Sequence, residues 1–203
     1  DLNIQQVVEK YISNFMDGMA NGPRGAEGAA NVGVIVANPK NGEILAMATD
    51  NPYDLNNPRD LTSYYSQDEI NGMDNATMLE NLYGIWKNYC ISDAFEPGST
   101  VKPLTIGAAL DADVVQPSDT FVCDGYQMFG GTRIRCSIYP GAHGTETLSD
   151  LIKHSCNDGL MQIGALLGPE EFLKYQKIFN FGATTGIDLP GEATGILHTE
   201  ESL

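Results

Sequence analysis

Two short stretches of the 203-residue sequence contain residue types that could perform chemistry. In EPGSTVK, residues 96–102, Ser99 and Lys102 lie three positions apart, directly after Pro-Gly. Residues three apart on a helix share one face, so the hydroxyl and the amine can meet. A serine becomes a nucleophile when a base takes its proton, and a lysine whose pKa is lowered by burial can be that base. Taken alone, the pattern favours a helix-capping serine and a solvated lysine.

The second stretch is KHSCNDG, which contains Ser155 and Asn157 at a predicted junction between two helices. The hydroxyl could relay a proton between Lys102 and a leaving group, and the carboxamide could hydrogen-bond a substrate peptide group. The simpler interpretation is a capping turn, because Ser, Asn and Asp favour helix ends. Each stretch alone is therefore weak evidence for a catalytic site, and the interpretation depends on the rest of the sequence.

Composition excludes several classes of partner. Lysine and arginine number 11 against 27 acidic residues, a formal net charge of −16. Nucleic acid and anionic membrane surfaces are bound by clustered cations, so neither is expected as a partner. No stretch approaches the roughly 20 apolar residues of a membrane span. The chain starts directly in an amphipathic pattern, so we expect any targeting or anchoring segment to have been removed or never to have been present.

The cysteines and histidines do not follow a metal-binding or disulfide-scaffold pattern. Four cysteines are few for a chain of this length, and they lack the paired CxxC spacing of a structural zinc site. Cys123 and Cys136 flank a probable hairpin, where a disulfide and two unpaired thiols remain open alternatives. The three histidines have no ligand spacing, so no metal is expected; they are His143, His154 and His198.

The spacing of apolar residues predicts several helices and only a few strands. Helices are expected over 3–20, around 77–90, from about Ser99 with Gly98 or Ser99 as N-cap, on both sides of 155–157, and over PEEFLKYQKIF. Two apolar runs, 32–37 and 43–49, flank PKNG and predict a hairpin buried on both faces. Residues 50–76 are expected to form a surface excursion, and 119–136 a small β-excursion. A two-stranded hairpin cannot be a sheet by itself, so the sheet is expected to be incomplete in this chain.

These stretches together resemble a known family. EPGSTVK with the preceding WKNYCISDAF, and KHSCN, resemble the first two of the SxxK, SxN and KTG motifs of penicillin-binding proteins. VGVIVANPKNGEILAMAT, NPYDLNNP and FNFGATTGIDLPGEATG resemble other segments of the same family in the expected order. The similarity spans essentially the whole chain and looks closest to the class B, monofunctional type.

The resemblance implies a fold and roles for four residues. The fold would be α/β (α+β), an antiparallel sheet covered by helices plus a helical subdomain, with residues 1–203 forming a partial transpeptidase domain. Ser99 would attack a D-Ala-D-Ala stem peptide or a β-lactam, and Lys102 would accept its proton. Ser155 would pass that proton to the leaving group, and Asn157 would hydrogen-bond the acyl chain. No cofactor would be needed.

The sequence departs from the family pattern at the third motif. No KTG or KSG is present, and Thr184-Thr185-Gly186 lies in the segment that resembles the loop before GIDLPGE. In the family the third motif lies on a central strand later in the chain than residue 203. The resemblance therefore implies a domain cut before its last strands, with half of the oxyanion hole missing.

The resemblance also implies surroundings and leaves alternatives. Partners would be peptidoglycan stem peptides, β-lactam antibiotics and cell-wall synthesis proteins, at the extracytoplasmic face of a bacterial membrane to which a segment outside this chain would anchor the protein. A serine β-lactamase is an alternative, although Glu170 and Glu171 do not resemble its deacylating glutamate. A non-catalytic β-lactam sensor or scaffold is another. Arg133 and Arg135 could meet anionic wall polymer, or simply be solvated.

Overall fold

The computed structural model describes residues 1–20 and 29–199, and these divide into two compact units. The first unit comprises Asp1–Asp93 with Ile187–Ala193, and the second comprises Ala94–Gly186 with the segment from Thr194 onward. No helix in the described ranges is both long and apolar enough to cross a membrane. Each unit has its own buried residues, so each is described separately.

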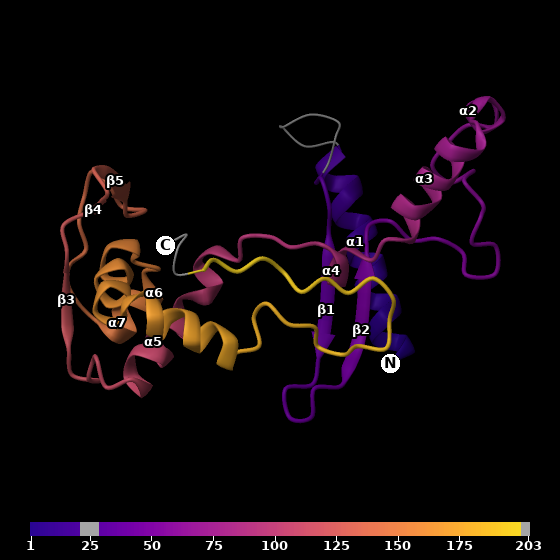
Figure 1. The fold of residues 1–203 in the computed structure, drawn as a ribbon. Helices are drawn as coiled ribbons and strands as arrows, with labels where there is room; N and C mark the ends of the chain where they lie inside the picture. Colours follow the sequence, from indigo (N-terminus) through magenta and orange to yellow (C-terminus); the bar gives the residue numbers. More distant parts are fainter. Residues whose placement is uncertain (21–28, 200–203) are drawn as a thin grey trace. The chain divides into compact units, whose positions relative to one another are not determined.

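In the part of the first unit that the structure describes, a β-hairpin is accompanied by the helices α1 to α4 (Figure 1). Its elements are α1 (Leu2–Ala20), β1 (Gly33–Ala37), β2 (Ile44–Thr49), α2 (Gln67–Gly72), α3 (Asn75–Trp86) and α4 (Tyr89–Ser92). The predicted hairpin is confirmed: β1 and β2 pair antiparallel, and Gly42 takes a left-handed φ of 75° in the connecting turn. Helix α1 lies against β2, where the Gln5 side chain bonds both backbone groups of Met47, each at 2.9 Å.

Burial of this hairpin differs from the prediction. We predicted that both faces would be buried, but Ile35 and Ile44 are 47% and 42% exposed, while Ala46 and Ala48 are buried. Within the described residues β1 and β2 form a two-stranded sheet, and the alternate residues Gly33, Ile35 and Ala37 of β1 are exposed. In α1 only Ile12 is buried, and much of the predicted apolar stripe remains exposed.

Residues 50–76 form the expected surface excursion, with the short helix α2 in it. Ser66 and Glu69 cap α2 reciprocally, which explains why a six-residue helix starts there. Leu61, Leu82 and Ile85 form a small apolar cluster beneath the segment. Trp86 lies half-buried at the edge of this cluster and donates from Nε1 to the Pro58 carbonyl at 2.6 Å.

The second unit carries the residues of both candidate motifs. Its elements are the 3₁₀ helix η1 (Gly98–Val101), α5 (Lys102–Asp111), β3 (Thr120–Cys123), β4 (Tyr126–Phe129), β5 (Thr132–Arg135), β6 (Gly144–Thr147), α6 (Leu148–Lys153) and α7 (Asn157–Ile178). Strand β3 pairs with β6, and β4 with β5, both antiparallel. Helix α7 packs against α5 and contacts β3 and β4 (Figure 1). The core between them is centred on Ala109, Leu151 and Ile163, each fully buried.

The start of α5 differs from the prediction. Neither Gly98 nor Ser99 is an N-cap: both lie in η1, and α5 begins at Lys102 after Val101, with no capping side chain. Gly98 has a left-handed φ of 58°, so it turns the chain into η1 rather than capping a helix. Pro103 lies in the first turn of α5, where a missing N–H costs little.

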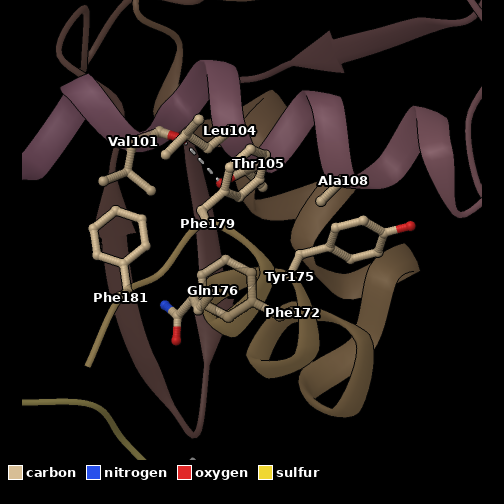
Figure 2. A pocket seen from close by; sticks show the side chains of 9 residues that line it. All are labelled: Val101, Leu104, Thr105, Ala108, Phe172, Tyr175, Gln176, Phe179 and Phe181. Carbon is tan, nitrogen blue, oxygen red and sulfur yellow. Dashed lines mark hydrogen bonds between the residues drawn. The ribbon is translucent and has the colours of Figure 1, made fainter. Parts of the chain in front are cut away.

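The second half of α7 is set at an angle by Gly168. This residue has φ 75° and ψ 164°, so α7 is two helices joined by a kink. This agrees with the prediction of a separate helix over PEEFLKYQKIF, which begins at Pro169. The second half packs on α5 around a small apolar recess (Figure 2), lined by Val101, Leu104, Thr105, Ala108, Phe172, Tyr175, Gln176, Phe179 and Phe181. These contacts fix α5, and therefore Lys102 at its start, against the helix that starts at Asn157.

Candidate active site

The Lys102 ammonium group joins the two predicted motifs. Its Nζ donates to the Ser155 carbonyl at 2.6 Å, to Ser155 Oγ at 2.9 Å and to Asn157 Oδ1 at 2.7 Å. An ammonium has three N–H donors, so these three acceptors satisfy it completely. The structure therefore brings together three of the four predicted residues. Lys102 is more than 50 positions away in the chain from Ser155 and Asn157.

Lys102 is partly removed from water at this position. Desolvation lowers its pKa below the ordinary lysine value, and the nearby sulfurs of Cys136 and Cys156 act in the opposite direction. A lowered pKa increases the fraction of neutral amine, which is the form that accepts a proton. Neutral Nζ would still donate to the Ser155 carbonyl and to Asn157 Oδ1, while its lone pair could accept from a hydroxyl.

Ser155 is positioned by the way α6 ends. The Ser155 N–H donates to the Ile152 carbonyl, and the Cys156 N–H donates to the Leu151 carbonyl, the bond pattern of a Schellman helix terminus. Ser155 takes the left-handed residue of that motif, with φ 50°. Glycine usually occupies this position, and a side chain there costs roughly 1–2 kcal/mol. A strained non-glycine residue is typical of functional sites, and here it directs a hydroxyl to Lys102.

Asn157 is held at both ends of its amide group. It is the first residue of α7; Oδ1 accepts from Lys102, and Nδ2 donates to the Arg135 carbonyl at 3.2 Å. The next residue, Asp158, is fully buried and accepts from the backbone N–H groups of Asp124 and Gly125 at 2.9 and 3.1 Å. These bonds tie the start of α7 to the β3–β4 connection and restrict the position of Asn157.

The structural role of Asp158 was not predicted from the sequence. Its Oδ1 also accepts from Gln127 and Gln162, at 2.7 and 2.8 Å. Burial alone would raise the pKa of this carboxyl, but the hydrogen bonds outweigh burial and lower it. A polar residue directly after SxN in an otherwise apolar helix start was the only signal in the sequence.

Ser99, the predicted nucleophile, lies one short turn before Lys102. The Lys102 backbone N–H donates to the Ser99 carbonyl, and the Ser99 side chain is exposed. Among the described residues no hydrogen bond joins its hydroxyl to Lys102 Nζ. The structure thus leaves the Ser99 hydroxyl open to an incoming molecule, while the amine is directed to the SxN residues.

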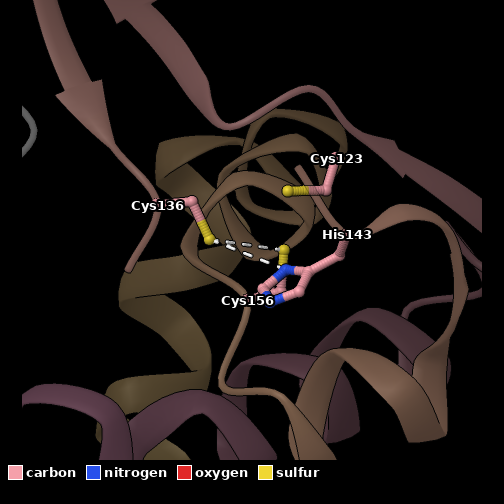
Figure 3. Close-up of side chains that lie close together, drawn as sticks. All are labelled: Cys123, Cys136, His143 and Cys156. Atoms are coloured by element: carbon pink, nitrogen blue, oxygen red, sulfur yellow. Dashed lines mark hydrogen bonds between the residues drawn. The ribbon is translucent and has the colours of Figure 1, made fainter. Parts of the chain in front are cut away.

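A second cluster that the sequence analysis did not find lies behind the SxN segment (Figure 3). It contains Cys123, Cys136, His143 and Cys156, whose sulfur and ring nitrogen atoms all lie within 4.8 Å of one another. All four cysteines of the chain are free thiols, so the disulfide considered for Cys123 and Cys136 is not formed. Cys136 follows the β4–β5 hairpin, and its sulfur lies 3.8 Å from that of Cys156.

The pKa values of Cys136 and Cys156 are shifted in opposite directions. Burial alone would raise the pKa of Cys136, but backbone groups of Asp158, Ile138 and Asn157 hydrogen-bond to its sulfur and bring its pKa down to about 6. Burial raises the pKa of Cys156, and a hydrogen bond to the Glu146 carboxylate raises it further. The thiolate form of Cys136 is therefore favoured, next to the backbone at the start of α7.

Glu146 connects this cluster to the histidines. Its carboxylate is buried; Oε1 lies 2.6 Å from His154 Nδ1, and Oε2 lies 3.5 Å from His143 Nδ1. The imidazole rings of His143 and His154 are stacked, with their centres 5.1 Å apart. We had interpreted both histidines as ordinary, and their separation in sequence gave no sign that they would share a buried carboxylate.

Arg133 and Arg135 lie against aromatic rings rather than standing free. The Arg133 guanidinium is 4.7 Å from the centre of the Tyr126 ring, and Arg135 is 4.9 Å from that of Tyr139. Both belong to β5, whose residues are exposed. Stacking of this kind contributes about 0.5–1 kcal/mol at an exposed site, so these residues have a local structural role.

A serine–lysine pair at a helix start, joined through the lysine to an S-x-N turn, defines a class of serine acyl-transfer domains. Residues 32–203 match the family described as Penicillin binding protein transpeptidase domain. The chain belongs to this family, and its mixed α/β architecture is that of its solved members.

Relatives with assigned names agree with this membership. Stage V sporulation protein D of Bacillus subtilis is 36% identical over 97% of this chain, and the peptidoglycan D,D-transpeptidase MrdA of Haemophilus influenzae is 27% identical over 98%. Penicillin-binding protein 3 of Mycobacterium tuberculosis superposes with a TM-score of 0.72 at 26% identity, covering all of this chain and 39% of that one. The chain spans 26% and 28% of the two curated relatives.

Proposed function

We propose that this chain carries the acyl-transfer residues of a peptidoglycan D,D-transpeptidase. Family membership and the names of the relatives support the reaction class, and the contacts of Lys102 support the roles of the residues. The substrate would be a stem peptide ending in D-Ala-D-Ala. A β-lactam would react at the same serine, in keeping with aztreonam and ampicillin complexes of the M. tuberculosis neighbour.

In the proposed mechanism Ser99 Oγ attacks the carbonyl carbon, and its proton passes to neutral Lys102 Nζ. The backbone N–H of Ser99 donates to the developing oxyanion. Lys102 then returns the proton through the Ser155 hydroxyl to the nitrogen as the acyl C–N bond breaks. A stem peptide releases D-alanine at this step, whereas the nitrogen of an opened β-lactam stays tethered to the acyl group. The ester on Ser99 is resolved when the amine of a second stem peptide attacks it.

The single observation that carries this proposal is the triple contact of Lys102 with Ser155 and Asn157. A solvated lysine and a capping serine, the simpler interpretation of each motif, would not produce it. The 2.9 Å between Nζ and Ser155 Oγ is the distance that a proton relay requires. Partial burial of Lys102 favours the neutral amine that the first step needs.

A β-lactamase needs a positioned base for deacylation, and the two candidate glutamates do not provide one. Glu170 and Glu171 lie in the second half of α7, beyond the kink at Gly168, and Glu171 accepts from Lys174 at 2.7 Å. We therefore propose a long-lived acyl-enzyme rather than hydrolytic turnover. Residues 1–203 would be one part of a transpeptidase domain, whose third motif lies outside this sequence.

The proposed setting follows the family. The protein would act on peptidoglycan at the extracytoplasmic face of a bacterial membrane, anchored by a segment outside this chain, together with other cell-wall synthesis proteins. No cofactor is part of the proposed mechanism.

The test is intact-protein mass spectrometry after incubation with benzylpenicillin. We expect one adduct per chain, absent in Ser99→Ala and retained in Ser118→Ala, which removes an exposed hydroxyl elsewhere in the same unit. Because one missing oxyanion donor costs about 10²–10³ in rate, adduct formation should be slow in this chain and faster in a version extended through a third motif. No adduct in the extended version would contradict the proposal.

A further inference from the structure

The four side chains in Figure 3 come from four separate segments and converge on one point. Cys123 ends β3, Cys136 follows β5, His143 precedes β6, and Cys156 is the N-cap of α7. The three cysteines are buried, and His143 is largely covered, with 12% of its side chain exposed. Thiols that merely fill a core do not need an imidazole among them, so the combination calls for an explanation.

Two of the distances within the cluster are close to the edges of a metal tetrahedron. With zinc–sulfur bonds of about 2.3 Å and zinc–nitrogen bonds of about 2.0–2.1 Å, two ligand sulfurs lie about 3.8 Å apart, and a sulfur and a nitrogen about 3.6 Å. The Cys136 and Cys156 sulfurs are 3.8 Å apart, and Cys136 Sγ is also 3.8 Å from His143 Nδ1. A disulfide would require about 2.05 Å between sulfurs.

The types of ligand atom in the cluster indicate which metal it would bind. Three thiolates and one imidazole form a Cys₃His set, which suits Zn²⁺ and excludes the hard cations Ca²⁺ and Mg²⁺, which take oxygen ligands. Four protein ligands leave no open position, which is typical of a structural rather than a catalytic zinc site. The alternative group of His143, Glu146 and His154 is less suitable, because the His154 side chain is 40% exposed.

A buried carboxylate lies beside the cluster. Glu146 Oε2 is buried without a hydrogen-bond partner among the described residues, and lies 3.5 Å from His143 Nδ1. A buried acceptor without a partner is costly. A Zn²⁺ ion bound at His143 Nδ1 would lie near this oxygen and interact favourably with it.

We propose that Cys123, Cys136, His143 and Cys156 bind a Zn²⁺ ion that clamps the SxN segment from behind. Cys156 is the residue between Ser155 and Asn157, and Cys136 follows Arg135, whose carbonyl accepts from Asn157 Nδ2 at 3.2 Å. The metal would therefore fix both partners of Lys102. The ligands are positioning residues, and their metal binding does not depend on the proposed acyl transfer.

The experiment measures metal directly on the whole 203-residue chain. Purified under reducing conditions with added zinc, the protein should contain one zinc per chain by elemental mass spectrometry. Cys136→Ser and His143→Ala should each retain less than about a tenth of that zinc. Cys90→Ser is the matched control, because Cys90 is the one cysteine outside the cluster, and it should retain the metal fully.

A cobalt titration of the reduced, metal-free wild-type chain decides the question even where a variant fails to fold. We expect a saturable spectrum with one Co²⁺ per chain, strong visible bands of tetrahedral cobalt and a thiolate-to-cobalt charge-transfer band, both abolished by stoichiometric Zn²⁺. A weak octahedral spectrum without charge transfer would overturn the proposal. So would a tetrahedral spectrum unchanged in folded Cys136→Ser, or a Cys136–Cys156 disulfide whose reduction restores no Co²⁺ binding.

Discussion

Lys102 Nζ lies 2.7 Å from Asn157 Oδ1, and the two residues are 55 positions apart in the chain. The first starts α5 and the second starts α7, so the bond joins the beginnings of two packed helices. Because Asn157 Nδ2 also donates to the Arg135 carbonyl, the amide cannot rotate without breaking one of its bonds. Lys102 is thus held by a neutral acceptor, which leaves its lowered pKa intact.

Replacing that neutral acceptor by a charge should move the pH dependence. In Asn157→Asp, a carboxylate beside Nζ favours the ammonium form and should raise the pKa of Lys102 by about 1–3. At neutral pH, penicillin acylation should fall by at least tenfold and should recover as the pH rises. The measurement is the acylation rate against pH, compared with Asn157→Ala. A loss of the same size at every pH in both variants would contradict the electrostatic explanation.

The wild-type chain should itself show a pH-dependent acylation rate. The neutral amine is the reactive form, and desolvation lowers the pKa of Lys102 below its ordinary value of 10.5. The rate should therefore rise with pH through a midpoint below 10.5. Lys102→Arg keeps the charge but does not deprotonate in this range, so its rate should be low and flat. A midpoint at or above the ordinary lysine value would show that Nζ is not desolvated.

Asp158 should be important for stability. Its carboxylate accepts four hydrogen bonds in a fully buried position, and Asp158→Asn would turn an NH₂ group toward some of these donors. We expect a loss of about 2–4 kcal/mol in the free energy of unfolding, measured by urea denaturation. Asp124→Asn, at an exposed neighbour, should change it by less than about 0.5 kcal/mol. Equal effects of the two would mean that the buried network contributes little.

The backbone strain at Ser155 can be separated from the loss of its hydroxyl. Both Ser155→Gly and Ser155→Ala remove the hydroxyl that bonds to Lys102, but only glycine adopts the left-handed φ of 50° without a steric cost. The glycine variant should be more stable than the alanine variant by about 1 kcal/mol, and both should acylate slowly. An alanine variant as stable as the glycine variant would show that the Schellman turn is not strained.

The sequence predicted local features well because they depend on neighbouring residues. Asn41-Gly42 specifies a hairpin turn, and the junction at 155–157 follows from residues that favour helix ends. The N-cap at Ser99 was wrong because the proline-glycine pair starts a 3₁₀ turn instead. The two-sided burial of the hairpin was wrong because burial depends on what packs against the sheet, and apolar runs do not specify that.

In the candidate site, too, the residues could be predicted from the sequence but their packing could not. The four motif residues were found through the family resemblance, but the contacts of Lys102 depend on how α5 packs on α7, and sequence spacing does not encode that packing. The cysteine–histidine cluster escaped for a related reason. Its members at 123, 136, 143 and 156 come from four segments and form no short motif, although β3, β6 and α7 bring them within 4.8 Å.

The central claim, that Ser99 is the residue acylated, is tested most directly by locating the adduct. The chain would be incubated with benzylpenicillin and digested, and the peptides sequenced by tandem mass spectrometry. The account predicts a penicilloyl group on Ser99, with little or none on Lys102 or Ser155. An adduct on any other residue, formed equally in Ser99→Ala, would contradict it.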